Sequence, residues 1–159
     1  MISAEEYLVY CDTALDGYAA ICRELGDELV GVRVAGLDGG NSAFGLVAHV
    51  VGVMARWGRT VNRGIVVPRD RDAEFRATGS VDQALALLAA GRAGLHEDVA
   101  AASFGDPPAD PPAPRPEPGY ETQGAVLLHV YEELAQHLGQ LEVTRDVLLR
   151  ERRTASADR

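Results

Sequence analysis

Basic residues are scarce in this sequence. The chain has 15 Lys and Arg residues against 24 Asp and Glu residues, which gives a formal net charge of -9. A surface field of this sign repels the phosphate backbone of nucleic acids and the headgroups of anionic lipids. The composition therefore argues against nucleic acids and anionic membrane surfaces as partners.

Cysteine is almost absent. Cys11 and Cys22 are the two cysteines, and on one helix they would lie about 16 Å apart along the axis. A disulfide requires Cα atoms closer than about 7 Å. We therefore expect two free thiols that are buried as small apolar side chains, as is typical of a reducing compartment.

Long apolar runs are also absent. The best stretch, residues 44–54, contains His49 and is shorter than the roughly 18 to 20 residues that a bilayer crossing requires. The amino terminus carries Glu5 and Glu6 where a secretory signal has basic residues. These features predict a cytoplasmic protein that does not enter a membrane.

The remaining composition is typical of one globular domain. The chain has 159 residues, of which 47% are hydrophobic and 25% are charged. This length suffices for one core but not for two cores and a linker. We expect a single domain over residues 1–150, followed by a frayed or disordered tail over residues 151–159.

Four segments have the apolar periodicity of amphipathic helices, each beginning near a capping residue or a polar turn. The expected ranges are 4–25 (or 4–29 if Gly26 is tolerated), 43–61, 81–102 and 122–150. The expected caps are the box formed by Ser3 and Glu6, then Asn41 or Ser42, and Ser80.

Two long segments connect these helices. Residues 62–79 contain Gly64, Pro68 and mixed charges with little periodicity, so we expect an ordered crossover loop there and no further helix. Residues 106–120 hold seven prolines, which favours an extended, polyproline-like spacer across the bundle. Four helices with long crossover loops predict an all-α four-helix bundle.

The fourth expected helix carries three residues with metal-ligand chemistry at four-residue spacing: His129, Glu133 and His137. The two histidines are eight residues apart, about 12 Å along the axis, so they cannot hold the same ion. In projection, Glu133 and His137 lie next to the apolar stripe, whereas His129 points farthest outward. Glu133 and His137 are therefore the inward pair.

A third ligand must come from another helix, and His49 in the middle of the second expected helix is the obvious donor. The other histidine, His96, lies beside two acidic residues in a setting typical of solvent. Two histidines and one carboxylate leave coordination positions open, as in catalytic metal sites. The residues alone leave an alternative open, in which the fourth helix presents an exposed hydrogen-bonded ridge and His49 is an ordinary interface residue.

Three segments of the sequence resemble the DinB-like superfamily. They are LVAHVVGVMARW at 46–57, PRDRDAEF at 68–75, and HVYEELAQHLGQ at 129–140 followed by TRD at 144–146. The closest branch is similar to the N-terminal domain of the mycothiol-dependent maleylpyruvate isomerases. The resemblance implies a DinB-like four-helix bundle in which His49, Glu133 and His137 bind one divalent metal and serve as the catalytic residues.

The resemblance also implies chemistry on a low-molecular-weight thiol, with mycothiol as the thiol of the family. The metal, with zinc as the first candidate and nickel, iron or manganese as others, would hold the thiol as a thiolate that adds to a small electrophile. Isomerisation or S-transfer would follow, depending on the substrate. Isomerases of this family commonly carry a second domain, and this chain ends shortly after the fourth helix, so an S-transferase fits equally well.

Arg145 falls on the apolar stripe of the fourth helix, where an unpaired charge is costly. Either a carboxylate from a neighbouring helix neutralises it, or it faces the pocket and binds an anionic thiol or acid as a cofactor-binding residue. Arg69 and Arg71, in the connection over residues 62–79, are weaker candidates of the same kind.

Two classes of function remain at this point. The first is a metal-dependent, thiol-using transferase or isomerase that acts on small electrophiles. The second is a non-catalytic helical bundle that binds a metal or another ligand. Exposed apolar helix edges make a homodimer a reasonable expectation for either class.

Overall fold

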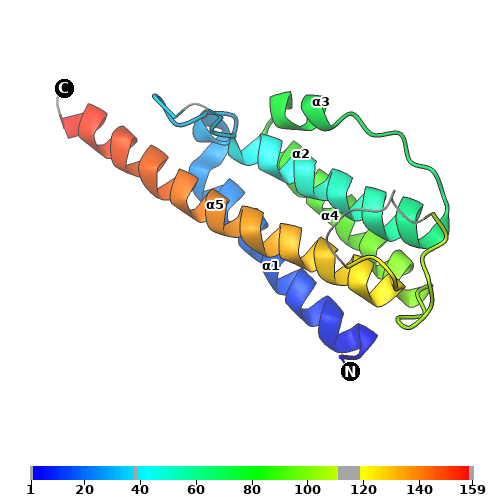
Figure 1. The fold of residues 1–159 in the computed structure, drawn as a ribbon. Coiled ribbons are helices and arrows are strands. Elements are labelled where there is room, and N and C mark those ends of the chain that lie inside the picture. Colours follow the sequence, from blue (N-terminus) through cyan, green and yellow to red (C-terminus); the bar gives the residue numbers. More distant parts are fainter. Residues whose placement is uncertain (1, 38, 111–118, 158–159) are drawn as a thin grey trace.

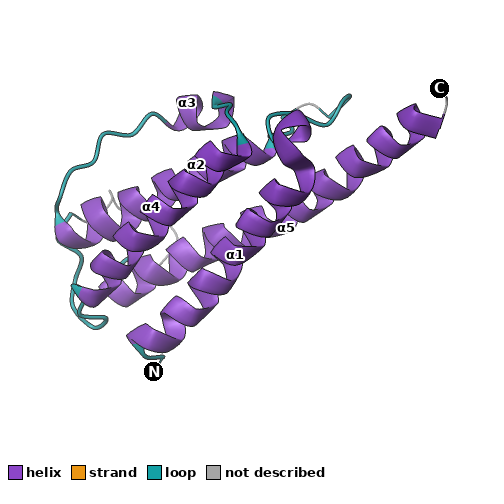
Figure 2. Cartoon of the chain, turned by 180° about the vertical axis from the view of Figure 1, so that it is seen from behind, coloured by secondary structure: helices purple, strands orange, loops and turns teal. Residues whose placement is uncertain are grey.

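The computed structural model describes residues 2–37, 39–110 and 119–157, and within these ranges the chain is helical and has no β-strand (Figures 1 and 2). Its long helices are α1 (Ala4–Leu29), α2 (Ala43–Met54) with the π-helical continuation η1 (Ala55–Val61), α4 (Val81–Ala100) and α5 (Gln123–Ala157). A short helix, α3 (Arg71–Arg76), lies between α2 and α4 in the chain. The all-α bundle predicted from the sequence is confirmed. Among the described residues, no helix has the length and apolarity that a bilayer crossing requires.

The four long helices form a bundle in which α1 and α2 each pack against both α4 and α5. Helices α1 and α5 run in the same direction (Figure 1). They are joined by two buried tyrosines of α1, since the hydroxyl of Tyr7 donates to the carbonyl of Leu127 and that of Tyr18 donates to the carbonyl of Leu134. Helices α2 and α4 run together in the opposite direction (Figure 1), so α2 lies antiparallel to α5 along their contact.

The two long connections follow different courses. The segment 62–80 returns along the bundle and joins the parallel helices α2 and α4 (Figures 1 and 2). The second connection begins and ends at the same end of the bundle, because the amide of Gly124 donates to Phe104 O and the amide of Gln123 donates to Asp106 O. No spacer across the bundle is therefore needed there, in contrast to the expectation. Residues 111–118 lie outside the described residues, so polyproline geometry there stays a prediction.

The helices begin at the capping residues expected from the sequence. Ser3 and Ser80 each form a capping box, and Ser42 is the cap of α2. Helix α1 continues to Leu29, but Gly26 has a φ of 68° and is not helical, so the chain passes it with a kink. The span expected for the second helix is confirmed, although its last part is a π-helix.

Two parts of the chain differ from the expectation. Residues 71–76 form helix α3 where a loop was expected; Asp70 caps it by accepting from the amide of Ala73, and none of its residues is buried, so it shows no apolar periodicity. Helix α5 extends to Ala157, although residues from 151 onward were expected to be frayed, and residues 151–157 are exposed. The boundary that was expected at residue 150, between the domain and its tail, therefore lies within α5.

The expected apolar stripes form the core. The buried members on α2 and η1 are Leu46, Val47, Val50, Met54 and Trp57, and those on α5 include Leu127, Leu134 and Leu141. Burial of each such side chain contributes about 1.5–3 kcal/mol. His49 lies on α2 with the first group of buried residues and is itself buried. The packing of α2 against α5 therefore places its imidazole in the interior of the bundle.

Candidate metal centre

His49 on α2 converges with Glu133 and His137 on α5 where the two helices pack. Glu133 Oε2 lies 3.4 Å from His49 Nε2 and 3.5 Å from His137 Nε2. The three atoms that could bind a metal all lie within 4.8 Å of one another. The structure therefore brings together the three residues predicted from the sequence.

The spacing of these atoms suits a small divalent cation. Zinc bonds nitrogen and oxygen at about 2.0–2.2 Å, so two ligands of a tetrahedral ion lie about 3.4 Å apart. The distances from Glu133 Oε2 to the two imidazoles are already close to this separation. The two imidazole nitrogens also lie within 4.8 Å of each other.

His49 Nε2 is a buried polar atom that has no hydrogen-bond partner in the part of the chain described. The His49 side chain is only 2% exposed, and Glu133 Oε2 at 3.4 Å is near it without completing a hydrogen bond. Buried polar atoms are almost always paired, because an unpaired one costs about 1–3 kcal/mol. A cation between this nitrogen and the carboxylate would satisfy both groups, so the donor set fits a metal.

The other nitrogen of each histidine has a partner that fixes the ring. His49 Nδ1 donates to Glu74 Oε2 at 2.9 Å, and His137 Nδ1 donates to Gln140 Oε1 at 3.0 Å. With the proton on Nδ1, each ring turns the lone pair of Nε2 toward the Glu133 carboxylate. A hydrogen-bond acceptor behind the histidine is the usual support of a metal ligand in proteins.

Glu133 carries the negative charge of the cluster. The neighbouring imidazoles of His137 and His49 hold the pKa of Glu133 well below its usual range, so this group is a carboxylate. The same proximity to Glu133 raises the pKa of His137. A proton on His137 Nε2 therefore competes with a metal for this place, and metal binding is expected to release protons.

Two residues of helix α3 contact the imidazole of His49 and fix its position. The Glu74 carboxylate accepts from His49 and also from Arg69, which donates to its two oxygens at 2.7 and 2.9 Å. The ring of Phe75 stacks on the imidazole of His49, with the centroids 4.3 Å apart. Glu74 and Phe75 were not predicted as site residues, although both belong to the segment 68–75 that carries part of the family resemblance.

Gly52 allows the Glu74 carboxylate to lie against α2. A Cβ added at position 52 would overlap with Glu74 Oε1. A larger residue at this place would push the carboxylate away from His49 Nδ1. The stability of the protein should therefore depend on this glycine.

Gly52→Ala is expected to destabilise the fold by about 1–3 kcal/mol, because the added Cβ displaces the Glu74 carboxylate and leaves His49 Nδ1 and Arg69 without their hydrogen-bond partner. Gly139→Ala is the matched control: Gly139 lies on α5, its added Cβ meets no atom within 4 Å, and Ala in a helix is about 0.5–1 kcal/mol more favourable than Gly. Urea unfolding measures both free energies. Equal stabilisation by the two substitutions would show that Glu74 does not fill the space at Gly52.

His129 does not point outward, contrary to the prediction. Its side chain is 17% exposed, and its ring makes edge contacts with Trp57 at 4.7 Å and Tyr120 at 5.4 Å between centroids. These two aromatic side chains, which a projection of α5 alone does not include, cover it. Its Nδ1 lies 3.1 Å from Glu132, and its Nε2 lies 3.8 Å from Glu133 Oε1. His129 therefore borders the cluster but does not belong to the three converging atoms.

Arg145 lies apart from the cluster. Its guanidinium is 3.6 Å from the Glu24 carboxylate of α1 and 2.8 Å from Asp146. A neighbouring helix thus supplies a neutralising carboxylate, which was the first of the two alternatives. Arg145 also lies eight residues beyond His137, about 12 Å along α5. Its role in binding a thiol or an acid stays a prediction, and its contacts give that role no support.

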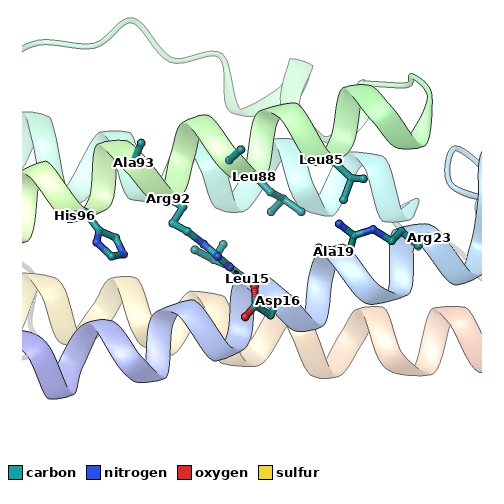
Figure 3. A pocket seen from close by; sticks show the side chains of 10 residues that line it. Leu15, Asp16, Ala19, Arg23, Leu85, Leu88, Arg92, Ala93 and His96 are labelled. Atoms are coloured by element: carbon teal, nitrogen blue, oxygen red, sulfur yellow. Dashed lines mark hydrogen bonds and ion pairs between the residues drawn. The ribbon is translucent and has the colours of Figure 1, made fainter.

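A groove of about 450 Å³ lies between α1 and α4 (Figure 3), and none of the three converging residues lines it. Its lining is largely aliphatic, and ion pairs cross between its helices. Arg92 of α4 pairs with Asp16 of α1, and His96 Nε2 lies 3.0 Å from an Asp12 oxygen. The His96 side chain is 43% exposed, as expected from its sequence context, and serves this contact between helices.

Cys11 and Cys22 are free and buried, as predicted. Burial raises the pKa of each thiol to about 11. Both are therefore protonated at neutral pH and are poor nucleophiles. A thiolate that reacts in this protein has to come from a bound small molecule.

A model of a known protein family matches most of the chain. Residues 8–149 match the family model described as mycothiol S-transferase. The chain belongs to the mycothiol S-transferase family. This family is part of the DinB-like superfamily, so the resemblance found in the sequence is confirmed. Searches of curated proteins and of solved structures gave no match.

Membership in the mycothiol S-transferase family indicates a mycothiol-related transferase activity with a small-molecule thiol as partner. The sequence had pointed to the maleylpyruvate isomerase branch as the closest one, and the match to a transferase family does not confirm an isomerase. The identity of the metal and the homodimer stay predictions.

Proposed function

We propose that this chain is a metal-dependent transferase that conjugates mycothiol with small electrophiles, and that His49, Glu133 and His137 bind its divalent metal. The observation that carries this proposal is the buried Nε2 of His49, which has no hydrogen-bond partner among the described residues and lies 3.4 Å from the Glu133 carboxylate. The family match supports mycothiol as the thiol, and the three converging donor atoms support a metal-binding site.

The chemistry of the three donors favours a catalytic metal over a structural one. Two imidazoles and one carboxylate are a common set for zinc in enzymes, and they also suit nickel, iron or manganese. Structural zinc sites have four protein ligands, whereas this set has three and leaves coordination positions for a substrate. Zinc is the first candidate because it is the usual ion of such catalytic sites.

The burial of the three residues supports access from one side. The His49 side chain is 2% exposed, whereas Glu133 and His137 are 26% and 22% exposed. The α2 side of the cluster is therefore closed by the core and by α3, and its α5 side is open to solvent. A thiol and an electrophile would meet on the open side.

The proposed reaction replaces a leaving group of the electrophile with the sulfur of the thiol. The S–C bond forms while the bond from carbon to the leaving group breaks, the leaving group departs with the electron pair, and the thiol proton passes to solvent. A divalent cation at the cluster supplies a positive charge that lowers the pKa of a nearby thiol. The residues of the chain supply the geometry, since two packed helices hold His49, Glu133 and His137 in place.

The experiment that tests this proposal compares metal-free and reloaded protein. A chelator removes the metal, zinc is added back to one half, and both halves are incubated with mycothiol and a panel of alkyl halides and activated aryl halides. Mass spectrometry measures the S-conjugate. We expect conjugation above the spontaneous rate with reloaded protein, and the spontaneous rate alone with metal-free protein.

Two outcomes would contradict the proposal in different ways. If the metal-free and the reloaded protein conjugated the electrophile at equal rates above the spontaneous rate, the reaction would not require the metal. The spontaneous rate with every electrophile, measured on protein that has bound zinc, would favour the alternative of a non-catalytic metal-binding bundle.

A further inference from the structure

Arg71, the first residue of α3, lies beside the three converging residues. Its guanidinium carbon is 5.2 Å from the centroid of the Phe75 ring, and the same ring stacks on His49. Arg71 is also close enough to His137 for its positive charge to act on that imidazole. Arg71 is therefore within electrostatic reach of both faces of the cluster, one formed by α2 and the other by α5.

Arg71 has no carboxylate partner among the residues that the structure describes, and this separates it from Arg69. Arg69 donates to both oxygens of Glu74 and is thereby neutralised. Arg71 is exposed, and its planar guanidinium lies over the Phe75 ring in a cation–π contact. The N–H groups at the edge of that plane remain available, and their geometry matches the two oxygens of a carboxylate.

Arg33 adds a second cation next to Phe75. Its Nη2 donates to the backbone carbonyl of Phe75 at 2.6 Å, and none of the described carboxylates pairs with it. The chain as a whole has a formal net charge of -9 and repels anions. Arg33 and Arg71, which have no carboxylate partner among the described residues, therefore supply positive charge beside Phe75.

We propose that Arg71 binds a carboxylate of the electrophile, so that the transferase prefers electrophiles that carry an acid group. This inference rests on the proposed function, because it places the electrophile on the open side of the cluster, at its edge with α3, where the exposed guanidinium of Arg71 can reach it. Arg71 determines specificity in this arrangement and does not bind the metal. Arg33 raises the local positive potential without being the primary contact, because its Nη2 is already engaged by the backbone.

The test uses a matched pair of aryl electrophiles, a chloronitrobenzoate and its carboxamide, with mycothiol and zinc-loaded protein. Arg71→Gln is expected to raise the KM for the benzoate by about 10-fold to 100-fold, the range expected for a lost hydrogen-bonded charge pair, and to leave the KM for the carboxamide unchanged. The KM of Arg71→Lys for the benzoate should lie between those of the unchanged protein and Arg71→Gln, because lysine keeps the positive charge but lacks the paired N–H groups of the guanidinium. Arg76→Gln, an exposed arginine at the other end of α3, is the matched control and should change neither value.

A second measurement does not depend on turnover. Isothermal titration of the benzoate into zinc-loaded protein without thiol is expected to give at least about 10-fold weaker binding for Arg71→Gln than for the unchanged protein. A protein that binds the benzoate through Arg71 but conjugates neither electrophile would contradict the proposed transferase and leave the role of Arg71 intact. Equal benzoate binding by the unchanged protein and Arg71→Gln, or equal losses for benzoate and carboxamide, would overturn the role of Arg71.

Discussion

His137→Ala is expected to remove metal binding and, with it, thiol conjugation. The substitution removes one of the three metal donors. The two donors that remain, His49 on α2 and Glu133 on α5, are too few to bind a metal tightly. Loss of a supporting residue behind a ligand typically costs about 10-fold to 100-fold in metal affinity, and loss of the ligand itself should exceed that range. Isothermal titration with zinc measures the affinity, and mass spectrometry of the conjugate measures the reaction.

His129→Ala is the matched control for this prediction. His129 lies on the same helix with a similar spacing to Glu133, but its ring packs against Trp57 and its Nε2 faces the other oxygen of Glu133. Metal binding should therefore survive this change. If His129→Ala lost zinc and His137→Ala kept it, the choice of ligands on α5 would be wrong.

Glu74→Gln is expected to weaken metal binding by about 10-fold to 100-fold, the usual effect of removing a carboxylate behind a histidine ligand. Glu74 accepts from His49 Nδ1 at 2.9 Å and from Arg69, so it fixes the orientation of the His49 ring. A neutral amide at this position leaves Arg69 without its counter-charge and offers His49 a weaker acceptor. The zinc affinity of the purified variant gives the effect directly.

Asp72→Asn controls for the loss of one negative charge on α3. Asp72 is exposed and belongs to the same short helix. We expect its zinc affinity to match that of the unchanged protein. Equal losses for Glu74→Gln and Asp72→Asn would mean that net charge, and not the contact with His49, controls the affinity.

The sequence was sufficient to predict the long helices and the three converging residues, for identifiable physical reasons. The helices follow from apolar periodicity and from capping residues such as Ser3 and Ser80, both of which are local properties of the chain. The pair on α5 follows from its four-residue spacing, which places Glu133 and His137 about one turn apart on one face. His49 then follows because a third donor was needed from another helix.

The surroundings of the site could not be predicted in the same way. Helix α3 is six residues long and buries none of them, so its only local signal was Asp70 as a cap. The position of Glu74 behind His49 depends on the approach of α3 to Gly52, which is a tertiary contact. The projection of α5 placed His129 farthest outward because a projection of one helix does not contain the side chains of Trp57 and Tyr120 that cover it.

Elemental analysis of the protein purified without a histidine tag tests the central claim most directly. We expect about one equivalent of zinc or another divalent transition metal per chain in the unchanged protein and in His129→Ala, and almost none in His137→Ala. Protein that carries no such metal as purified and binds none after incubation with zinc would contradict the assignment of His49, Glu133 and His137 as a metal centre.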